Sequence, residues 1–151
     1  MRISARADYA VRAAAELAAG ADEPMTAQAL ARAAAVPHRF LESILTDLRR
    51  EGVIVSRRGA GGGHQLARPA ASVTIADVIR AVEGPLVFVR DERPGDIAYG
   101  GAAAALPEVW VALRANVRAV LERVSLADLA AGRVPASVRR LTEDEDAWRA
   151  P

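Results

Sequence analysis

Two stretches of the chain carry the side chains best suited to recognising another molecule. The first, HRFLESILTDLRR at residues 38–50, sets polar and charged residues between regularly spaced apolar ones. Arginine can grip two acceptors of a guanine, and glutamate can accept a hydrogen bond from a cytosine amine. Arg39, Glu42 and Ser43, with His38 beside them, are therefore candidates for reading base edges. The plain alternative is a solvated, charged helix face.

The second stretch, RRGAGGGHQLARP at residues 57–69, places two arginines directly before a five-residue block that holds four glycines. Glycines let the backbone approach a groove wall, and Arg57 or Arg58 suits the negative potential of a narrow minor groove. A nucleotide-phosphate loop is excluded, because no lysine followed by serine or threonine comes after the glycines and the loop leads into a strand. A plain glycine-rich hairpin remains the alternative.

Residue types that support other chemistry are scarce. The chain has no cysteine and only two histidines, His38 and His64, which belong to different predicted elements. Disulfides, thiolate nucleophiles and cysteine-bound metals are excluded, and no serine–histidine–acid set or paired-carboxylate motif is evident. We therefore predict no catalytic residue, no metal ligand, no cofactor and no enzymatic activity.

The charge distribution favours a nucleic-acid partner. The formal net charge of +1 hides a basic segment: residues 30–70 hold seven arginines and three acidic residues, whereas residues 86–151 hold nine arginines and ten acidic residues. A locally basic first half is typical of nucleic-acid binding. No apolar run approaches the roughly 20 residues that cross a bilayer, and the N-terminus does not resemble a signal peptide. We expect a soluble, cytoplasmic protein that makes no membrane contact.

Three helices are predicted to position the first stretch. Apolar residues at four-residue spacing predict a helix over 4–19, and Thr26 can cap a short second helix. Pro37 suits the first position of a third helix, which Gly52 ends. The apolar side of this third helix comprises Phe40, Leu41, Ile44, Leu45 and Leu48.

The second stretch is predicted to be the loop of a β-hairpin, with short strand-like segments on both sides of its glycines. Thr74 and Asp77 then form the capping box of a further helix that Gly84–Pro85 close. We also expect Tyr9 to pack between the first helix and the hairpin. Two short helices followed by a hairpin predict a winged helix-turn-helix, so the fold class is mainly α with a small β-hairpin.

A long amphipathic helix is predicted after a loop over 86–106 that shows no steady period. Its apolar residues recur at three- and four-residue spacing, and a domain this small offers nothing to cover them. We therefore expect this helix to pair with its copy in a homodimer, which would place two reading helices about one DNA turn, roughly 34 Å, apart. The predicted dimerisation residues are Val109, Trp110, Leu113, Val117, Val120, Leu121 and Val124.

These elements divide the chain into four parts. Residues 1–85 form the predicted DNA-binding domain, and 86–106 form a loop that could act as a sensor. Residues 107–135 hold the dimerisation helix and a short helix capped by Ser125 and Asp128. Residues 136–151 are a polar tail.

The motifs ADYAVRAAAELA, VPHRFLESILTDLRREGVIVSRRGAGGGHQLARP, VTIADVIRAVEGPL and VSLADLAAG, in this order, resemble the Rrf-two family of winged-helix transcriptional regulators, which includes IscR, NsrR and CymR. The resemblance is close over about residues 1–85 and looser over the long helix. It implies a homodimer on a partly palindromic operator, with the third helix in the major groove and the wing in the minor groove.

The resemblance also indicates where this chain departs from its family. Many members hold an iron–sulfur cluster with three cysteines in the loop before the long helix, but residues 86–106 contain neither cysteine nor histidine. Some members draw further ligands from the first helix, where this chain has Asp8 and Arg12, and arginine is not a ligand. The family usually has an aromatic residue where His64 stands. We therefore do not expect a cysteine-ligated cluster.

The leading hypothesis is thus a sequence-specific DNA-binding regulator, a repressor in the first instance, that acts as a homodimer and responds to a small-molecule or protein effector. The alternative is a module of the same fold that binds DNA weakly and is controlled by a ligand or a protein partner. The residues expected to contact DNA are Arg2, Thr26, His38, Arg39, Glu42, Ser43, Arg57, Arg58, Gly59, Ala60, Gly61 and Gly62.

Overall fold

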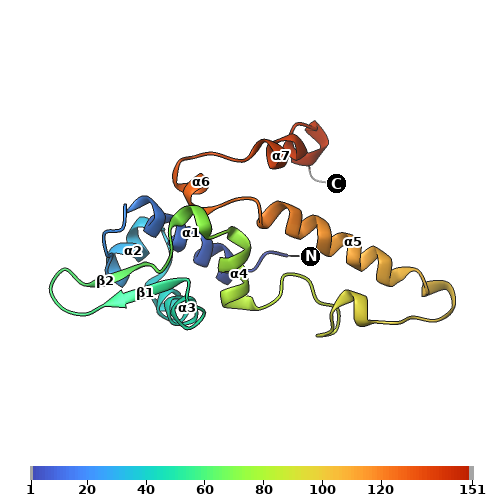
Figure 1. Cartoon of the computed structure of the whole chain (residues 1–151), viewed down its shortest axis with the longest axis horizontal. Helices are drawn as coiled ribbons and strands as arrows, with labels where there is room; N and C mark the ends of the chain where they lie inside the picture. The colour runs from blue at the N-terminus through green and yellow to red at the C-terminus, as the bar shows by residue number, and fades with distance from the viewer. Residues whose placement is uncertain (1, 150–151) are drawn as a thin grey trace.

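The computed structural model describes residues 2–149 and shows a winged-helix body from which a long arm extends (Figure 1). The predicted mainly helical fold with one small hairpin is confirmed. The helices are α1 (Ala5–Ala19), α2 (Ala27–Ala33), α3 (His38–Arg50), α4 (Ile75–Glu83), α5 (Leu106–Leu121), α6 (Leu126–Ala130) and α7 (Ala136–Arg139), and the strands are β1 (Ile54–Arg57) and β2 (Gly63–Leu66).

Side-chain caps set where the helices of the body begin. Ser4 and Thr26 accept hydrogen bonds from backbone amides in the first turns of α1 and α2, which satisfies donors that have no partner inside a helix. Pro37, predicted at the first helical position, is instead the residue that precedes α3. Its φ of −59° and ψ of 127° match the extended conformation that proline favours.

The core of the body lies between α1, α2, α3 and α4 and extends to the hairpin and α6. Its buried members include alanines of α1, leucines and an isoleucine of α3, and apolar residues of both strands. Small alanine side chains let α1 run close to its neighbours through the middle of the body. The largest fully buried side chains of the body are Leu30, Leu41, Ile44, Leu48, Ile54, Val73, Val78 and Leu126.

The short helix α6 belongs to this body rather than to the arm. The backbone amide of Leu126 donates to the Val73 carbonyl at 2.8 Å, and that of Ile75 donates to the Val124 carbonyl at 3.0 Å. These bonds join the segment that follows the long helix α5 to the segment at the start of α4. The helix α6 then packs on α1. The predicted capping boxes of Thr74 with Asp77 and of Ser125 with Asp128 are both present.

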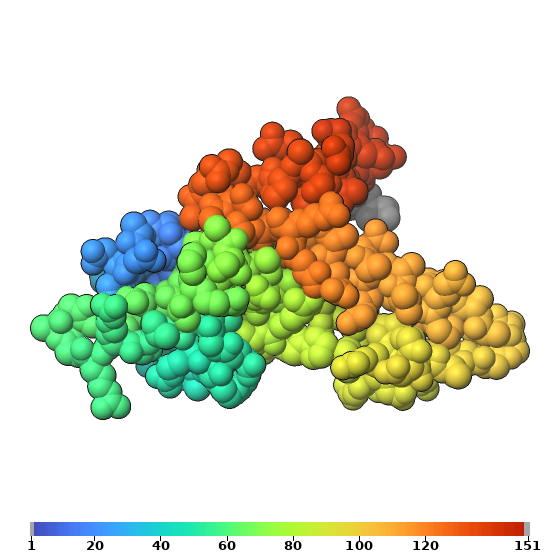
Figure 2. Space-filling view, in the orientation of Figure 1, coloured from blue at the N-terminus to red at the C-terminus, as the bar shows by residue number. Residues whose placement is uncertain are grey.

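The arm consists of α5 and the segment that precedes it, which folds back along the helix (Figure 2). The segment predicted as an irregular loop contains two short 3-10 turns, Pro94–Asp96 and Gly101–Ala103, and the first of them packs on α5. Val87, Pro94 and Ile97 are buried there. The arm therefore has a small core of its own, while α5 itself has no fully buried residue.

A cluster of charged side chains joins the arm to the body. Glu122, just after α5, accepts hydrogen bonds from Arg80 of α4 and, at 2.9 Å, from Arg118 of α5. These bonds lower the pKa of Glu122 from 4.5 to about 2. A depressed carboxyl pKa means that the stabilisation is present above pH 4.5 and is lost as the pH falls toward 2.

Replacing Glu122 by glutamine is expected to lower the free energy of unfolding by about 0.5–1 kcal/mol at pH 7, since partly exposed ion pairs are screened by water. The variant should lose stability less steeply than the wild type as the pH falls from 4.5 toward 2. Urea unfolding at several pH values measures both effects. Parallel stability–pH curves for the two proteins would contradict the assignment.

The C-terminal segment, predicted as a polar tail, forms α7 and two 3-10 turns, Arg140–Thr142 and Glu145–Trp148. Its residues up to 149 are exposed or half-buried, and the indole Nε1–H of Trp148 donates a hydrogen bond to the Thr142 carbonyl at 2.8 Å. No helix in residues 2–149 has the length and apolar character needed to cross a membrane.

Candidate nucleic-acid interface

Helix α3 presents its polar side to solvent, as the sequence predicts for a reading helix. His38, Arg39, Glu42 and Ser43 are exposed, while the leucines and isoleucine of the opposite side are buried in the core. Arg39 makes no ion pair with any residue of the described chain. Its guanidinium is therefore free to bind a base edge or a phosphate.

Phe40, which the sequence assigned to the apolar side of α3, is 42% exposed. Its ring lies between two other side chains: Arg39 stacks over it at 4.7 Å, and the Tyr9 ring of α1 lies 5.9 Å away at an angle of 37°. Tyr9 thus contacts α3, and its expected packing against the hairpin stays a prediction. Phe40 departs from the pattern because it belongs to the first turn of α3, next to open solvent rather than the core.

Ser43 is exposed, but its hydroxyl already has partners. It donates to the Phe40 carbonyl at 3.1 Å and accepts from Arg6 of α1 at 2.9 Å. Arg6 also forms an ion pair with Asp47. Arg6 is therefore a link that holds α3 against α1, and a DNA contact by Ser43 would have to share its hydroxyl with that link.

The turn between α2 and α3 is held by Arg12 of α1. Its guanidinium donates to the carbonyls of Ala34 and Ala35 at 2.5 and 2.6 Å and to Asp8 at 3.1 Å. Ala35 has a φ of 51°, a left-handed conformation that is unfavourable for alanine. Two charge-assisted hydrogen bonds to this turn offset that strain and set the angle at which α3 leaves α2.

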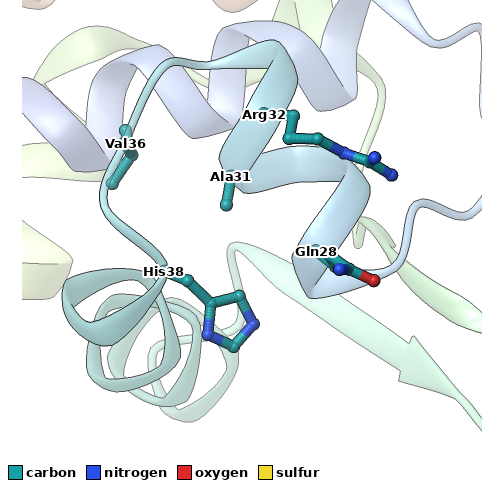
Figure 3. A pocket seen from close by; sticks show the side chains of 5 residues that line it. All are labelled: Gln28, Ala31, Arg32, Val36 and His38. Atoms are coloured by element: carbon teal, nitrogen blue, oxygen red, sulfur yellow. The ribbon is translucent and has the colours of Figure 1, made fainter.

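A hollow of about 550 Å³ lies beside the start of α3, lined by Gln28, Ala31, Arg32, Val36 and His38 (Figure 3). Its polar groups come from α2 and from the first residue of α3, and its floor is apolar. Gln28 and Arg32 are exposed donors that the sequence analysis did not single out. Their position on the polar side of α2, next to Thr26, is the signal that could have identified them.

The wing is docked onto the start of α2 through backbone bonds. His64 of β2 and Met25 exchange hydrogen bonds at 2.9 and 2.7 Å, so the hairpin lies directly against the residue before Thr26. The Thr26 hydroxyl itself caps α2 by accepting from Ala29 at 3.2 Å. A DNA contact at Thr26 would therefore come from a site where the helix start and the wing meet.

The wing loop projects away from the body, and Arg57, Arg58, Gly59, Ala60 and Gly61 are exposed while Gly62 is half-buried. The loop closes with a hydrogen bond from the Gly62 amide to the Gly59 carbonyl at 3.0 Å. A Cβ on Gly62 would lie 2.4 Å from the Arg57 carbonyl oxygen. The tight turn therefore requires glycine at position 62. Neither Arg57 nor Arg58 forms an ion pair among residues 2–149.

Gly63 is required for a different reason. Its φ is +147°, and a Cβ there would lie 2.5 Å from the carbonyl carbon and oxygen of Met25. The contact partner is backbone, which has little freedom to move aside. Gly63 thus allows the wing strand to approach the start of α2.

Replacing Gly63 by alanine is expected to cost at least about 2 kcal/mol of stability and to loosen the wing, because the substitution adds a backbone clash to the strain of a positive φ. Hydrogen exchange of the Met25 and His64 amides, together with thermal unfolding, measures the effect. Gly61→Ala is the matched control, since Gly61 has a φ of +72° but nothing within 4 Å of its Cβ position. Equal losses in the two variants would refute the docking argument.

His64, the histidine without a predicted role, joins the two strands and faces α3. Its Nδ1 lies 2.9 Å from the Ser56 hydroxyl, and it lines a cavity of about 220 Å³ with Glu42, Thr46 and Arg49. Burial, followed by the nearby charge of Arg49, lowers the pKa of His64 from 6.5. A neutral imidazole therefore occupies the junction of wing and reading helix, where the family usually has an aromatic ring.

Arg2 is exposed just before α1, and no ion pair of the described residues includes it. The structure gives it no partner that would prevent a phosphate contact, and that contact stays a prediction. The residues predicted to contact DNA thus lie at the start of α1, at the start of α2, on the polar side of α3 and in the wing.

The predicted dimerisation residues lie mostly on α5. Val109 is 55% exposed, and Trp110, Leu113, Val117, Val120 and Leu121 are half-buried. The prediction for Val124 was wrong. This residue lies beyond the end of α5 and is only 4% exposed, because it is buried where its carbonyl accepts a hydrogen bond from the start of α4. We call the other six residues the α5 stripe.

Part of the α5 stripe lines an apolar hollow. Val117, Val120, Leu121 and Asn116 of α5, together with Ile3, surround about 320 Å³. Ile3 is itself 65% exposed. Apolar side chains thus stay in contact with solvent along the helix in the single chain, which is the condition under which association buries them favourably.

Comparisons with known proteins give a consistent result. The family model described as Rrf2, iron-dependent transcriptional regulator, matches residues 3–132. A Mycobacterium tuberculosis protein named as an HTH-type transcriptional regulator is 48% identical over 145 residues, covering 95% of this chain and 90% of its own. The HTH-type transcriptional regulator CymR of Bacillus subtilis is 33% identical over 134 residues, covering 86% of this chain and 90% of CymR.

Solved structures agree. CymR, the global cysteine regulator of B. subtilis, has a TM-score of 0.69 at 30% identity and covers 87% of this chain and 98% of its own. A transcriptional regulator from Listeria innocua has a TM-score of 0.71 at 30% identity, and the match covers 95% of this chain and 94% of the Listeria protein. IscR of T. potens has a TM-score of 0.69 at 26% identity, and the match covers 100% of this chain and 93% of IscR.

The iron named in the family description has no matching donor set here. The chain has no cysteine, and residues 2–149 contain no group of three histidine or acidic side chains arranged to hold a metal. Asp8 and Arg12, which stand where some relatives supply cluster ligands, pair with each other, and Arg12 is committed to the turn before α3. These residues do not fit a cysteine-ligated iron–sulfur cluster.

Proposed function

The chain belongs to the Rrf2 family of transcriptional regulators, and on this basis we propose that it is a repressor that binds a partly palindromic operator as a homodimer, without a cysteine-ligated cluster. Family members are regulators of transcription rather than enzymes, and the winged-helix body is a DNA-binding fold. The resemblance drawn from the sequence motifs is thereby confirmed.

The observation that carries the proposal is the set of unpaired arginines on the reading helix and the wing. Arg39, Arg57 and Arg58 are exposed and free of ion pairs in the described part of the chain, whereas Arg6, Arg12 and Arg50 are paired with aspartates. Forked guanidiniums of this kind bind base edges and phosphates. In this arrangement α3 enters the major groove and the wing follows the minor groove.

The dimer supplies the spacing of the two reading helices. Helix α5 has 16 residues and is therefore about 24 Å long at 1.5 Å per residue. Pairing through the α5 stripe covers side chains that the single chain leaves exposed and gives the protein two-fold symmetry, which a palindrome matches.

Selection of genomic fragments by the purified full-length protein at near-physiological salt tests the proposal. We expect enrichment of fragments that share an inverted repeat, and protection of that repeat from cleavage on one face of the duplex. Fragments without a common motif would refute sequence-specific binding. Enrichment of a single, non-repeated half-site would refute the dimer on a palindrome.

Replacing both wing arginines by alanine is expected to weaken binding to all DNA and to flatten its salt dependence. Two lost phosphate or groove contacts should reduce the slope of log affinity against log salt by about 1.8, at about 0.9 per contact. Fluorescence anisotropy at several salt concentrations measures the slope. The control is Arg139→Ala plus Arg140→Ala, which removes two arginines from the C-terminal segment; equal slopes for the wild type and the wing variant would contradict the wing contact.

A further inference from the structure

A further pocket lies between α1 and α3. It encloses about 300 Å³ and is lined by Ala5, Arg6 and Tyr9 of α1 and by Phe40 and Ile44 of α3. Its walls are mainly apolar, and its volume lies at the lower end of the range of small-molecule sites, about 300–1,000 Å³. We call it the α1–α3 pocket.

Aromatic rings and cations define what this pocket would accept. Tyr9 and Phe40 present two rings whose centroids lie 5.9 Å apart. Arg12 lies over the Tyr9 ring at 5.5 Å, and Arg39 lies over the Phe40 ring at 4.7 Å. Rings arranged in this way favour a planar aromatic partner.

The charges around the rings favour an anion. Arg12 is paired with Asp8, and Arg6 shares Asp47 with Arg50, so these charges are largely compensated. Arg39 has no acidic partner in residues 2–149. One uncompensated guanidinium therefore stacks on Phe40, an aromatic residue that lines the pocket.

The pocket is also connected to the DNA-reading side chains. Phe40 carries Arg39 on its ring, and Arg6, which lines the pocket, bonds to Ser43 and Asp47 of α3. A molecule in the pocket must contact Phe40 and Arg6, because both line it, and these two residues in turn contact Arg39, Ser43 and Asp47. Occupancy would therefore compete with the resting position of Arg39 and strain the link between α3 and α1.

We propose that the α1–α3 pocket is an effector site for a small planar aromatic carboxylate, and that its occupancy weakens DNA binding through Phe40, Arg39 and Arg6. The binding step stands on the pocket alone, whereas the effect on DNA rests on the proposed function.

The first experiment measures binding without DNA. The probe is 2-naphthoate, titrated by calorimetry into the full-length protein, with uncharged 2-naphthamide as the comparison compound. We expect saturable binding of one 2-naphthoate per chain, weaker binding of the amide, and at least about tenfold weaker binding to Phe40→Ala, which loses one aromatic wall. Ala5→Leu, which fills the pocket from the exposed start of α1, should have the same effect without removing a core side chain.

The matched control is Phe88→Ala, because Phe88 is 39% exposed, close to the value for Phe40, but belongs to the arm. This variant should bind 2-naphthoate as the wild type does. Absence of saturable binding, equal affinity for acid and amide, or equal losses in the Phe40 and Phe88 variants would each overturn the site.

The second experiment measures the affinity for a selected operator with and without saturating 2-naphthoate. We expect weaker DNA binding in the presence of the probe for the wild type, and no effect of the probe for Ala5→Leu. Binding of the probe without any change in DNA affinity would overturn the regulatory step. If no DNA sequence is selected at all, the proposed function fails, while the calorimetric result still decides the pocket.

Discussion

If the protein is the homodimer that we propose, replacing Val109 and Val117 together by aspartate is expected to give a folded monomer and to lower operator affinity at least about 100-fold, the scale on which linked binding sites cooperate. Both residues belong to the α5 stripe, so the variant places up to four carboxylates in the proposed dimer interface. An unpaired carboxylate buried in an apolar contact is strongly unfavourable. Val109 is 55% exposed in the single chain, so the fold of one chain does not depend on its apolar side chain.

A matched control is available on the same helix. Val111 is 46% exposed, similar to Val109, but lies off the stripe. Val111→Asp should remain a dimer with wild-type affinity for its operator. Analytical ultracentrifugation gives the oligomeric state and anisotropy gives the affinity. A stripe variant that is still dimeric, or a Val111 variant that is monomeric, would show that the chains pair through another face.

Replacing Arg39 by alanine is expected to weaken binding to the preferred operator by about 5- to 150-fold for each half-site, which corresponds to the 1–3 kcal/mol of one bidentate base contact. The loss should be specific: non-specific DNA should be bound nearly as before, and discrimination should be lost at one base pair in each half-site. Arg39 forms no ion pair in the described chain, and its contact is with the exposed Phe40 ring on the solvent side of α3, so we expect its removal to leave the core of the fold intact.

Arg39→Lys separates base reading from simple charge. Lysine keeps the positive charge but lacks the planar fork that binds two acceptors of a guanine. We expect the lysine variant to retain the wild-type salt dependence and to lose the discrimination. Affinities for operators substituted at each position give the readout. If lysine restores both affinity and discrimination, Arg39 contacts a phosphate and the base contact must be assigned to another residue.

The features that were predicted correctly depend on neighbours in sequence. The capping boxes at Thr74 and Ser125 pair a hydroxyl with a carboxylate three residues later, and both formed because the contact is closed within one helical turn. The hairpin and the helices of the body follow in the same way from glycines, caps and apolar periodicity.

The features that were missed depend on residues far apart in sequence. Periodicity placed Phe40 on the apolar side of α3, but the residue lies in the first turn of that helix, where only Tyr9 of α1 is shown against its ring and 42% of it stays exposed. Val124 continued the spacing of α5, but it is buried because the chain returns there to pair with the start of α4. Spacing along one helix carries no information on which other element covers it.

The sequence by itself determined the winged-helix fold, the family and the residue types of the reading helix and wing, because short-range caps, turns and motifs specify them. Only the tertiary structure decided that Arg6 and Arg12 hold α3 and its turn, that Gly63 serves the approach of the wing to Met25, and that Tyr9 and Phe40 enclose a pocket. The physical reason is that an arginine or a ring shows the same pattern in sequence whether it meets solvent, DNA or another helix. Its role depends on which groups the fold brings within contact distance.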